Sequence, residues 1–198
     1  VIPGKCTELA HNAFQNNSAL TAVVIPSGVK SIRSYAFSGC ENLKTVDLPS
    51  GLTELGYGVF YRCTSLKSIE IPAALTEIPD DTFAYCTALA DVNIPDTIGS
   101  IGVNAFWKCT ALTEIYIPAG VTDISTGAFG GNQVQKITVD AKNTEYTDGG
   151  TNAIIEKSTG TLITGCKNTK ILSNVKKIAK FAFVEYENLE IGIPRSVV

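Results

Sequence analysis

Carboxylate side chains recur one repeat apart in this 198-residue chain, and paired carboxylates are the groups that hydrolyse glycosides. Asp47 and Glu70 are 23 residues apart, as are Asp91 and Glu114. On neighbouring strands the two groups of a pair could approach the ~5 Å separation of a retaining glycosidase. Catalysis also needs a cleft that raises the pKa of one carboxyl, whereas an open strand face exposes both to the same water. We therefore expect no enzymatic activity from these residues.

Metal-dependent and other catalytic chemistry finds no support in the residue types present. The carboxylates and Asn93 are oxygen ligands, but an extended ladder cannot wrap about six to eight of them round one Ca²⁺ ion. His11 is the only histidine and has no motif around it, which indicates a surface turn residue rather than a general base. We find no nucleophile elbow, phosphate-binding loop or metal-binding histidine pair. The sequence predicts no cofactor and no metal site.

Charge and hydrophobicity disfavour two classes of partner. A net charge of -3, with 18% charged residues, provides no basic surface for nucleic acid and no polybasic patch for lipid headgroups. No apolar run approaches the roughly 18 residues that a membrane helix needs. We expect no nucleic-acid partner and no membrane insertion by this segment.

A pattern that restarts every 23 residues positions all these side chains. Proline begins each copy, at Pro3, Pro26, Pro49, Pro72, Pro95 and Pro118. Counted from the proline, apolar residues stand at +3, +6, +17, +20 and +22, and a small residue stands at +10. The +11 column is Phe14, Phe37, Phe60, Phe83, Phe106 and Phe129. Such a period is typical of a solenoid, in which each coil buries its apolar face against its neighbours.

The local pattern predicts one short strand and one compact turn region per coil. The segment from Leu43 to Leu48 has the L-x-x-L-x-L form whose alternating part is a strand, and Pro49 ends it because proline cannot donate to a ladder. The stretch from +7 to +13, such as Arg33 to Gly39, is too short for a full helix, so we expect one helical or 3-10 turn. The expected fold is an α/β solenoid, mostly β, wound as a right-handed superhelix.

One coil shows the whole pattern: residues 94 to 118 read I-P-x-x-V-x-x-I-x-x-x-A-F-x-x-C-x-x-L-x-x-I-x-I-P, with Ile98 in place of valine. This pattern resembles the repeat of BspA-type (Treponema-type) leucine-rich repeat proteins of bacterial surfaces. The resemblance covers residues 1 to 140 and 171 to 198, and the segment around Asn143, Tyr146 and Asn152 is similar to a recurrent interruption in that family. It implies a secreted or surface-anchored adhesion or binding module, not a reaction.

Four of the six cysteines occupy the +14 column, which bears on whether they form disulfides. They are Cys40, Cys63, Cys86 and Cys109. Stacked strands place alpha-carbons about 4.8 Å apart, within the disulfide range, but parallel side chains leave the beta-carbons farther apart than the ~3.8 Å a bridge prefers. We expect buried thiols, with a bridge or a metal as the alternative. Cys6 and Cys166 lie outside this column without a C-x-x-C neighbour, which argues against zinc.

The period fails after residue 140 and divides the chain into three parts. These are a six-coil array (1–140), an insert (141–170), and a further coil with the truncated start of the next (171–198). Within the insert, residues 152–156 and 161–165 are β-prone and joined by residues 157–160, which predicts a β-hairpin. The hairpin either caps the sheet and holds the two arrays at a fixed angle, or protrudes as a ligand contact.

The outward side of the predicted strands is one candidate binding surface. Side chains at +19 and +21 point outward because residues alternate along a strand. The candidates on this strand face are Asp47, Glu70, Asp91, Asn93, Glu114 and Tyr116. A basic or hydroxyl-rich partner would suit them, although a solvated face that discourages sheet aggregation also explains them.

Aromatic side chains of the turn region form a second candidate face. They are Tyr35, Tyr57, Tyr61, Tyr85 and Trp107. Tyrosine and tryptophan are frequent contact residues for proteins and for sugar rings. Their offsets differ between coils, so they either form a contact surface or cover short loops and pack on neighbouring coils.

The expected function is non-catalytic binding. The resemblance implies an adhesion module, extracellular or at the cell surface of a bacterium, with a host or matrix protein or a glycan as partner. A structural spacer, or stalk, that presents other domains is the alternative. Since the chain opens and closes within the repeat, we expect it to be a piece of a longer protein.

Overall fold

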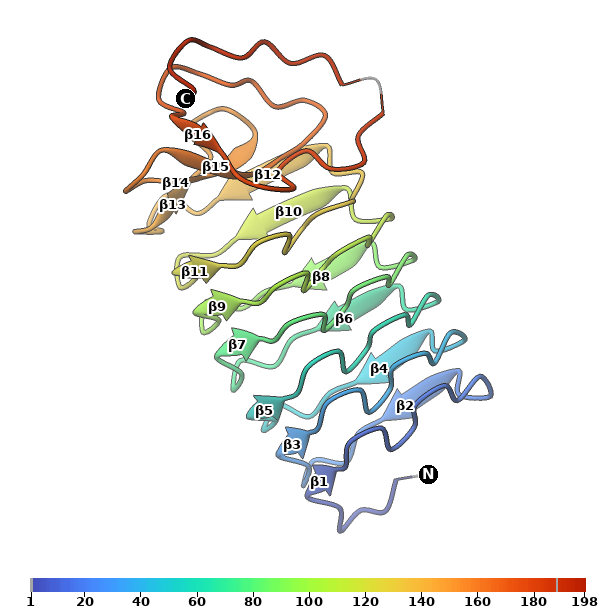
Figure 1. The fold of residues 1–198 in the computed structure, drawn as a ribbon. Helices are drawn as coiled ribbons and strands as arrows, with labels where there is room; N and C mark the ends of the chain where they lie inside the picture. Colours follow the sequence, from blue (N-terminus) through green and yellow to red (C-terminus); the bar gives the residue numbers. More distant parts are fainter. Residues whose placement is uncertain (1, 188) are drawn as a thin grey trace.

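The computed structural model describes residues 2–187 and 189–198, which form a solenoid of stacked coils made of short strands and turns (Figure 1). The coils follow one another from the N-terminus at one end to the last coil and the C-terminus at the other. The strands of the repeat lie in two rows, and every strand pair between these coils is parallel. The fold is therefore a mostly-β solenoid.

Each complete coil of the array carries two strands, so the prediction of one strand per coil is wrong. The long-strand row contains β2 (Ala22–Val24), β4 (Thr45–Asp47), β6 (Ser68–Glu70), β8 (Asp91–Asn93), β10 (Glu114–Ile117) and β12 (Lys136–Val139). The short-strand row contains β1 (Glu8–Leu9), β3 (Ser31–Ile32), β5 (Glu54–Leu55), β7 (Glu77–Ile78), β9 (Ser100–Ile101) and β11 (Asp123–Ile124). The C-terminal part adds β13 (Tyr146–Thr147), β14 (Ala153–Glu156), β15 (Thr161–Gly165) and β16 (Lys177–Ile178).

The short-strand row follows from the residues at +5 to +7. In β5, Glu54 at +5 is exposed and Leu55 at +6 is buried, which is the alternation of a strand. The next amide donates to the preceding coil, as Gly56 N does to the Ile32 carbonyl at 2.8 Å. An apolar residue at +6 alone does not reveal this ladder, which explains why the pattern indicated only one strand.

The short-strand row is interrupted between β5 and β7, and Pro79 accounts for the break. Pro79 occupies the position from which Gly56 donates in the preceding coil, and proline has no amide hydrogen. The Leu55 carbonyl therefore lacks this donor, and the row splits into the sheets β1-β3-β5 and β7-β9-β11. The long-strand row consists of the pairs β2-β4, β6-β8 and β10-β12.

The expected helical or 3-10 turns do not occur among residues 2–187 and 189–198, so the α/β part of the prediction is wrong. Amides at +9, +11 and +13 donate to the next coil instead of along their own coil. Phe14 N donates to the Ala36 carbonyl and Asn16 N to the Ser38 carbonyl, both at 2.7 Å. Because an α-helix needs its amides for carbonyls four residues earlier, this sideways bonding excludes it.

Two columns of the turn region adopt the left-handed backbone conformation. The +9 column contains Asn12, Tyr35, Gly58, Asp81, Asn104 and Gly127, and the +13 column contains Asn16, Gly39, Arg62, Tyr85, Lys108 and Gly131. Glycine adopts this conformation readily and asparagine and aspartate more readily than most, whereas other residues do so at a cost of about 1 to 2 kcal/mol. A left-handed residue every four positions also prevents a helix from forming.

A stack of phenylalanine rings runs through the core along the solenoid. Neighbouring rings from Phe14 to Phe129 have centroids 5.1 to 5.7 Å apart and planes within 14° of parallel. Buried leucine and isoleucine side chains from both strand rows surround this stack and join it in one core. The 23-residue register thus becomes a continuous column of apolar contacts.

The four cysteines of the +14 column are buried free thiols. Each donates to the carbonyl of a phenylalanine in the preceding coil, as Cys63 Sγ does to Phe37 at 3.2 Å. Asn132 takes the place of cysteine in the sixth coil, where its Nδ2 donates to the Phe106 carbonyl at 3.0 Å. From the second coil to the sixth, this column therefore holds a small side chain that donates one hydrogen bond to the preceding coil.

We expect a thiol reagent such as DTNB to modify only Cys6 quickly in the folded protein. Cys6 is partly exposed and the other five cysteines are buried. Burial raises the pKa of the column thiols, so they stay protonated and unreactive even as pH rises to 9. All six should react in denaturant without reductant. Fewer than six after unfolding would reveal a disulfide, and fast reaction of several native thiols would contradict their burial.

Residues 146–178 contain a four-stranded mixed sheet in the order β13-β14-β15-β16. β14 and β15 pair antiparallel across residues 157–160, but they do not form a separate inserted hairpin. β13 pairs with β14 on one side, and β16 of the last coil pairs parallel with β15 on the other. Ile154 packs in the main core, whereas Ile155 packs with Leu162 and Val175 in a second core. This sheet therefore closes one core and begins the next.

Candidate binding surfaces

The strand face carries its six predicted residues on exposed positions of the long-strand row. Asp47 lies on β4, Glu70 on β6, Asp91 and Asn93 on β8, and Glu114 and Tyr116 on β10. No strand ladder joins β4 to β6 or β8 to β10 in the described chain, so the carboxylates do not form one uninterrupted ladder. The face is a series of strand pairs.

Several polar groups of the strand face find partners within the protein. The contacts are Asn93 Nδ2 to Glu70 Oε2 (3.2 Å), Lys136 Nζ to Glu114 Oε2 (3.4 Å) and the Tyr116 hydroxyl to Asp140 Oδ2 (2.6 Å). The last bond lowers the pKa of Asp140 and raises that of Tyr116, because it stabilises the carboxylate and the protonated phenol. These contacts satisfy part of the charge that was expected to attract a ligand.

A hollow of about 530 Å³ lies where β8 and β10 are not joined by a ladder. Asp91, Glu114, Tyr116 and Lys136 contribute to its lining. Both signs of charge are present, so this hollow has no consistent preference for a cation or an anion.

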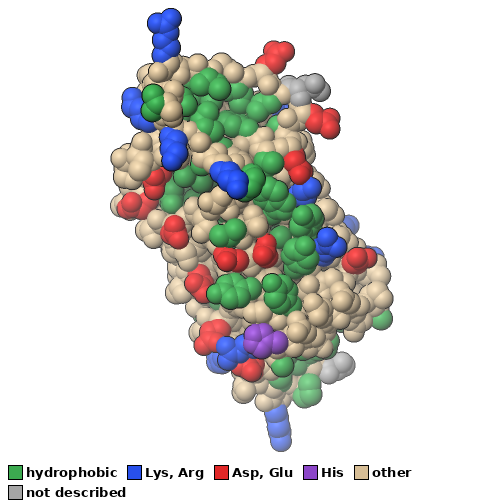
Figure 2. Space-filling view, in the orientation of Figure 1, with side chains coloured by type: hydrophobic (Ala, Val, Ile, Leu, Met, Phe, Trp, Pro, Cys, Tyr) green, Lys and Arg blue, Asp and Glu red, His purple; other side chains and the backbone are tan. Residues whose placement is uncertain are grey.

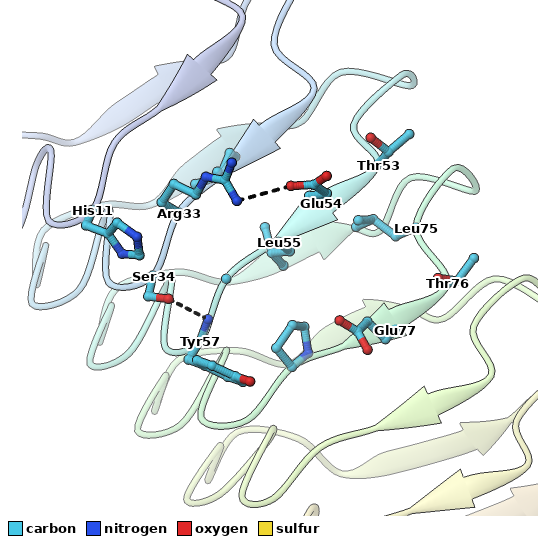
Figure 3. A pocket seen from close by; sticks show the side chains of 13 residues that line it. His11, Arg33, Ser34, Thr53, Glu54, Leu55, Tyr57, Leu75, Thr76 and Glu77 are labelled. Atoms are coloured by element: carbon cyan, nitrogen blue, oxygen red, sulfur yellow. Dashed lines mark hydrogen bonds and ion pairs between the residues drawn. The ribbon is translucent and has the colours of Figure 1, made fainter.

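A groove of about 370 Å³ lies at the interruption between β5 and β7 (Figure 3). Figure 3 shows Ser34 between His11 and Tyr57 along one side of the groove, where the Tyr57 amide donates to the Ser34 hydroxyl at 3.2 Å. Arg33 joins Glu54 of β5 at 3.2 Å and Glu8 of β1 at 2.6 Å. The hydrogen bond from Arg33, followed by one from Ser31, lowers the pKa of Glu8.

Four of the five predicted aromatic residues converge on one hollow of about 580 Å³, named here the aromatic hollow. Its main lining residues are Tyr35, Tyr61, Asp81, Tyr85, Asn104 and Trp107. The four rings come from successive coils, and Tyr61 and Tyr85 pack edge to face with centroids 5.6 Å apart. Tyr57 is 59% exposed and belongs to the β5–β7 groove instead. On the face seen in Figure 2, hydrophobic side chains gather in a band across several coils.

The last coil completes the aromatic hollow although it is distant in sequence. Phe181 packs edge to face on Trp107 with ring centroids 5.4 Å apart. Beside it, Lys108 Nζ and Glu185 Oε1 form an ion pair at 2.8 Å, which raises the pKa of Lys108. Sequence reasoning missed Phe181, because the interruption after residue 140 hides which coil the last one meets.

Asp81 and Asn104 supply the polar part of the hollow and were also missed. They occupy the left-handed +9 column in adjacent coils and line the hollow together. Burial raises the pKa of Asp81, and the neighbouring Asn104 amide opposes this shift. The sequence did contain a signal for this column, because Asn and Gly recur at +9 and these residues are typical of a left-handed backbone position. A different residue at +9, such as Asp81, could therefore have been singled out as a candidate.

Neither a metal cluster nor a membrane span emerges from the described residues. No three His, Cys, Asp or Glu side chains in residues 2–187 and 189–198 gather closely enough to hold an ion. The same residues form no helix with the length and apolarity that crossing a bilayer requires.

The repeat matches a known protein-family model. The BspA type leucine-rich repeat region matches residues 7–147 in six copies. The chain belongs to the BspA-type leucine-rich repeat family. The rings of Tyr35, Tyr61, Tyr85 and Trp107 all lie within the matched BspA-type repeats, while Phe181 lies beyond them.

Solved structures of similar proteins agree with the BspA-type assignment. A leucine-rich cell surface protein from Faecalibacterium prausnitzii is 34% identical with a TM-score of 0.83, over 91% of this chain and 50% of that one. The pneumococcal vaccine antigen PcpA shares the fold at 22% identity and a TM-score of 0.78, over 96% of this chain and 57% of that one. The leucine-rich repeat protein of T. pallidum is 28% identical with a TM-score of 0.54, over 69% and 71%.

The BspA-type chain spans about half the length of the Faecalibacterium protein that it matches. A search of curated proteins found no match. The family is a repeat solenoid, a class that uses extended surfaces for interaction, and the matches include no catalytic family.

Proposed function

We propose that this chain is a non-catalytic binding module of a secreted or surface-anchored bacterial protein, and that the aromatic hollow is its contact site. The observation that carries the proposal is the convergence of four rings from four coils on one partly open hollow. Tyrosine and tryptophan supply large contact areas at low cost in side-chain entropy. The partner is a host or matrix protein, or a glycan, met outside the cell.

Backbone conformation supports a role for the hollow. Tyr35, Asp81 and Tyr85 are left-handed, with φ of 60°, 55° and 63°. In the other coils these columns hold glycine or asparagine, for which the conformation costs little, or Arg62 and Lys108, whose cations lie beside the Tyr85 ring. Strained residues concentrate at functional sites, and here the strain at Tyr35 and Tyr85 displays two rings in the hollow that Asp81 also lines.

The open character of the other surfaces supports a non-catalytic role. Exposed carboxylates of the strand face experience similar water, whereas acid–base catalysis by a carboxyl pair needs two different environments. The similarity to a protein described as a cell surface protein supports the extracellular location.

Binding by the hollow is tested with the double variant Trp107→Ser and Tyr85→Asn. Ser38 and Asn16 occupy the same columns in other coils, so the variant keeps residue types that the repeat already accepts. We expect wild type to bind immobilised fibronectin, laminin or collagen, or cultured epithelial cells, and the variant to bind about tenfold or more weakly. The matched control is Tyr57→Ser, which removes an aromatic ring outside the hollow and should bind like wild type.

A structural spacer is the second candidate, and the internal pairing on the strand face together with the unbroken phenylalanine stack favours it. A spacer would tolerate the double variant but respond to removal of one whole 23-residue coil. Binding lost only when Asp47, Glu70, Asp91 and Glu114 are changed to Ala would assign the contact to the strand face instead.

A further inference from the structure

Tyr35 and Trp107, the first and last of the four rings in sequence, each pack against a glycine of the next coil. A Cβ added to Gly58 would clash with the ring of Tyr35, and one added to Gly130 would clash with the ring of Trp107. Both rings therefore lie against backbone at places where no side chain competes with them. Such seating holds the rings in position before a ligand arrives, which lowers the entropy cost of binding.

The rings present both faces and edges to the hollow. Tyr61 and Tyr85 are inclined at 72°, and Trp107 and Phe181 at 78°. A pyranose ring matches this arrangement, because its C–H groups form an apolar face that stacks on an aromatic ring while its hydroxyls project from the edge. The space of about 580 Å³ falls in the range of small-molecule sites and is open enough for a chain to continue outward.

Asp81 and Asn104 match the hydroxyls of such a ring. A carboxylate only accepts hydrogen bonds, whereas an amide both donates and accepts. The two side chains stand in adjacent coils and line the hollow beside the rings. Together they can accept a hydrogen bond from one sugar hydroxyl and donate one to a neighbouring hydroxyl oxygen.

Cations already occupy the surroundings of these rings, which argues against a cationic ligand. Aromatic cages also bind quaternary ammonium groups. The Arg62 guanidinium carbon, however, lies 5.4 Å from the Tyr61 centroid and 5.3 Å from that of Tyr85. Lys108 Nζ lies 5.7 Å from the Tyr85 centroid, and Lys180 Nζ lies 4.6 Å from that of Phe181. A further positive group would be repelled, whereas a sugar would not.

From the seated rings, the polar pair and these cations, we infer that the aromatic hollow is a carbohydrate site that holds one pyranose unit of a glycan. The inference rests on the proposed binding function and names its ligand class. Asp81 and Asn104 orient the sugar through its hydroxyls, and Trp107 and the tyrosines provide the stacking surface.

Trp107 is the only tryptophan in the chain, so its fluorescence reports on the hollow directly. The probes are methyl β-galactopyranoside, methyl α-mannopyranoside, N-acetylglucosamine, N-acetylneuraminic acid and a printed array of oligosaccharides. We expect saturable change in Trp107 emission with at least one sugar class, and saturation-transfer NMR signals concentrated on the C–H protons of one pyranose face. The same sugar should release the protein from the cells or matrix proteins that it binds.

Three single variants test the assigned residues: Tyr85→Asn, Asp81→Gly and Tyr35→Asn. Each places in the column a residue that another coil already uses, and thermal melting confirms folding. We expect each to weaken sugar binding about tenfold or more, while Tyr57→Ser leaves it unchanged. Equal sugar binding by wild type and all three variants would overturn the site.

Two other outcomes separate the ligand class from the function. Binding to enzymatically deglycosylated matrix protein through the hollow, with no response to any sugar, would refute the carbohydrate site and retain the binding module. Displacement by choline but by no sugar would also refute it, in favour of a cation. If neither sugar, cell nor matrix protein binds, both proposals fail.

Discussion

Replacing Phe83 by alanine is expected to lower the free energy of unfolding by about 3 to 5 kcal/mol. The ring is 1% exposed and stacks between Phe60, at 5.6 Å, and Phe106, at 5.3 Å. Those neighbours are held by their own coils and cannot move together to fill the space. A cavity therefore remains in the middle of the stack, and its lining loses contacts that water cannot replace.

Urea unfolding followed by circular dichroism measures this loss, with Phe14→Ala as the matched control. Phe14 stands at the end of the stack, is only partly buried and meets one ring, Phe37, at 5.1 Å. We expect the control to lose distinctly less stability than Phe83→Ala. Equal losses would show that the stack does not act as a continuous core.

Replacing Asn143 by alanine should cost at least about 3 kcal/mol. Its side chain is buried and makes four hydrogen bonds to the backbone. Nδ2 donates to the carbonyls of Pro118 and Val121, both at 2.8 Å, and Oδ1 accepts from the amides of Glu145 at 3.0 Å and Tyr146 at 2.7 Å. Alanine would leave these backbone groups without partners where the array meets the C-terminal sheet.

The control for this change is Asn42→Ala, also measured by urea unfolding. Asn42 is exposed and donates one hydrogen bond, to the Ser18 carbonyl at 2.8 Å. Its loss should fall within about 0.5 kcal/mol, as for surface substitutions generally. A small effect at Asn143 would mean that the C-terminal sheet is not fastened to the array by this residue.

The stacked coils were predictable because the side chains that contact one another between coils are the ones that recur every 23 residues. Phe37 and Cys40 predicted interior columns, and each became a column of contacts between coils. The second strand of each coil and the absence of helical turns were not predictable in the same way. Both depend on which carbonyl each backbone amide donates to. The types of the residues do not predict this directly, because every residue except proline carries the same amide.

The candidate site was predictable in part. Tyr35 at +9, Tyr61 at +12 and Tyr85 at +13 were recognised as outward aromatics, but unequal offsets gave no reason to group them. The left-handed +9 and +13 columns turn these offsets toward one hollow and leave Tyr57, at +8, outside it.

By itself the sequence determined the repeat, its interior columns and the BspA-type family, because stacking identical coils requires the same apolar residue at the same place each time. Only the tertiary structure decided that the aromatic rings share a hollow with Asp81, and that Phe181 joins them from the last coil. The physical reason is that these residues meet through backbone turns and through the sheet at 146–178, whose geometry sets contacts between coils that no local period encodes.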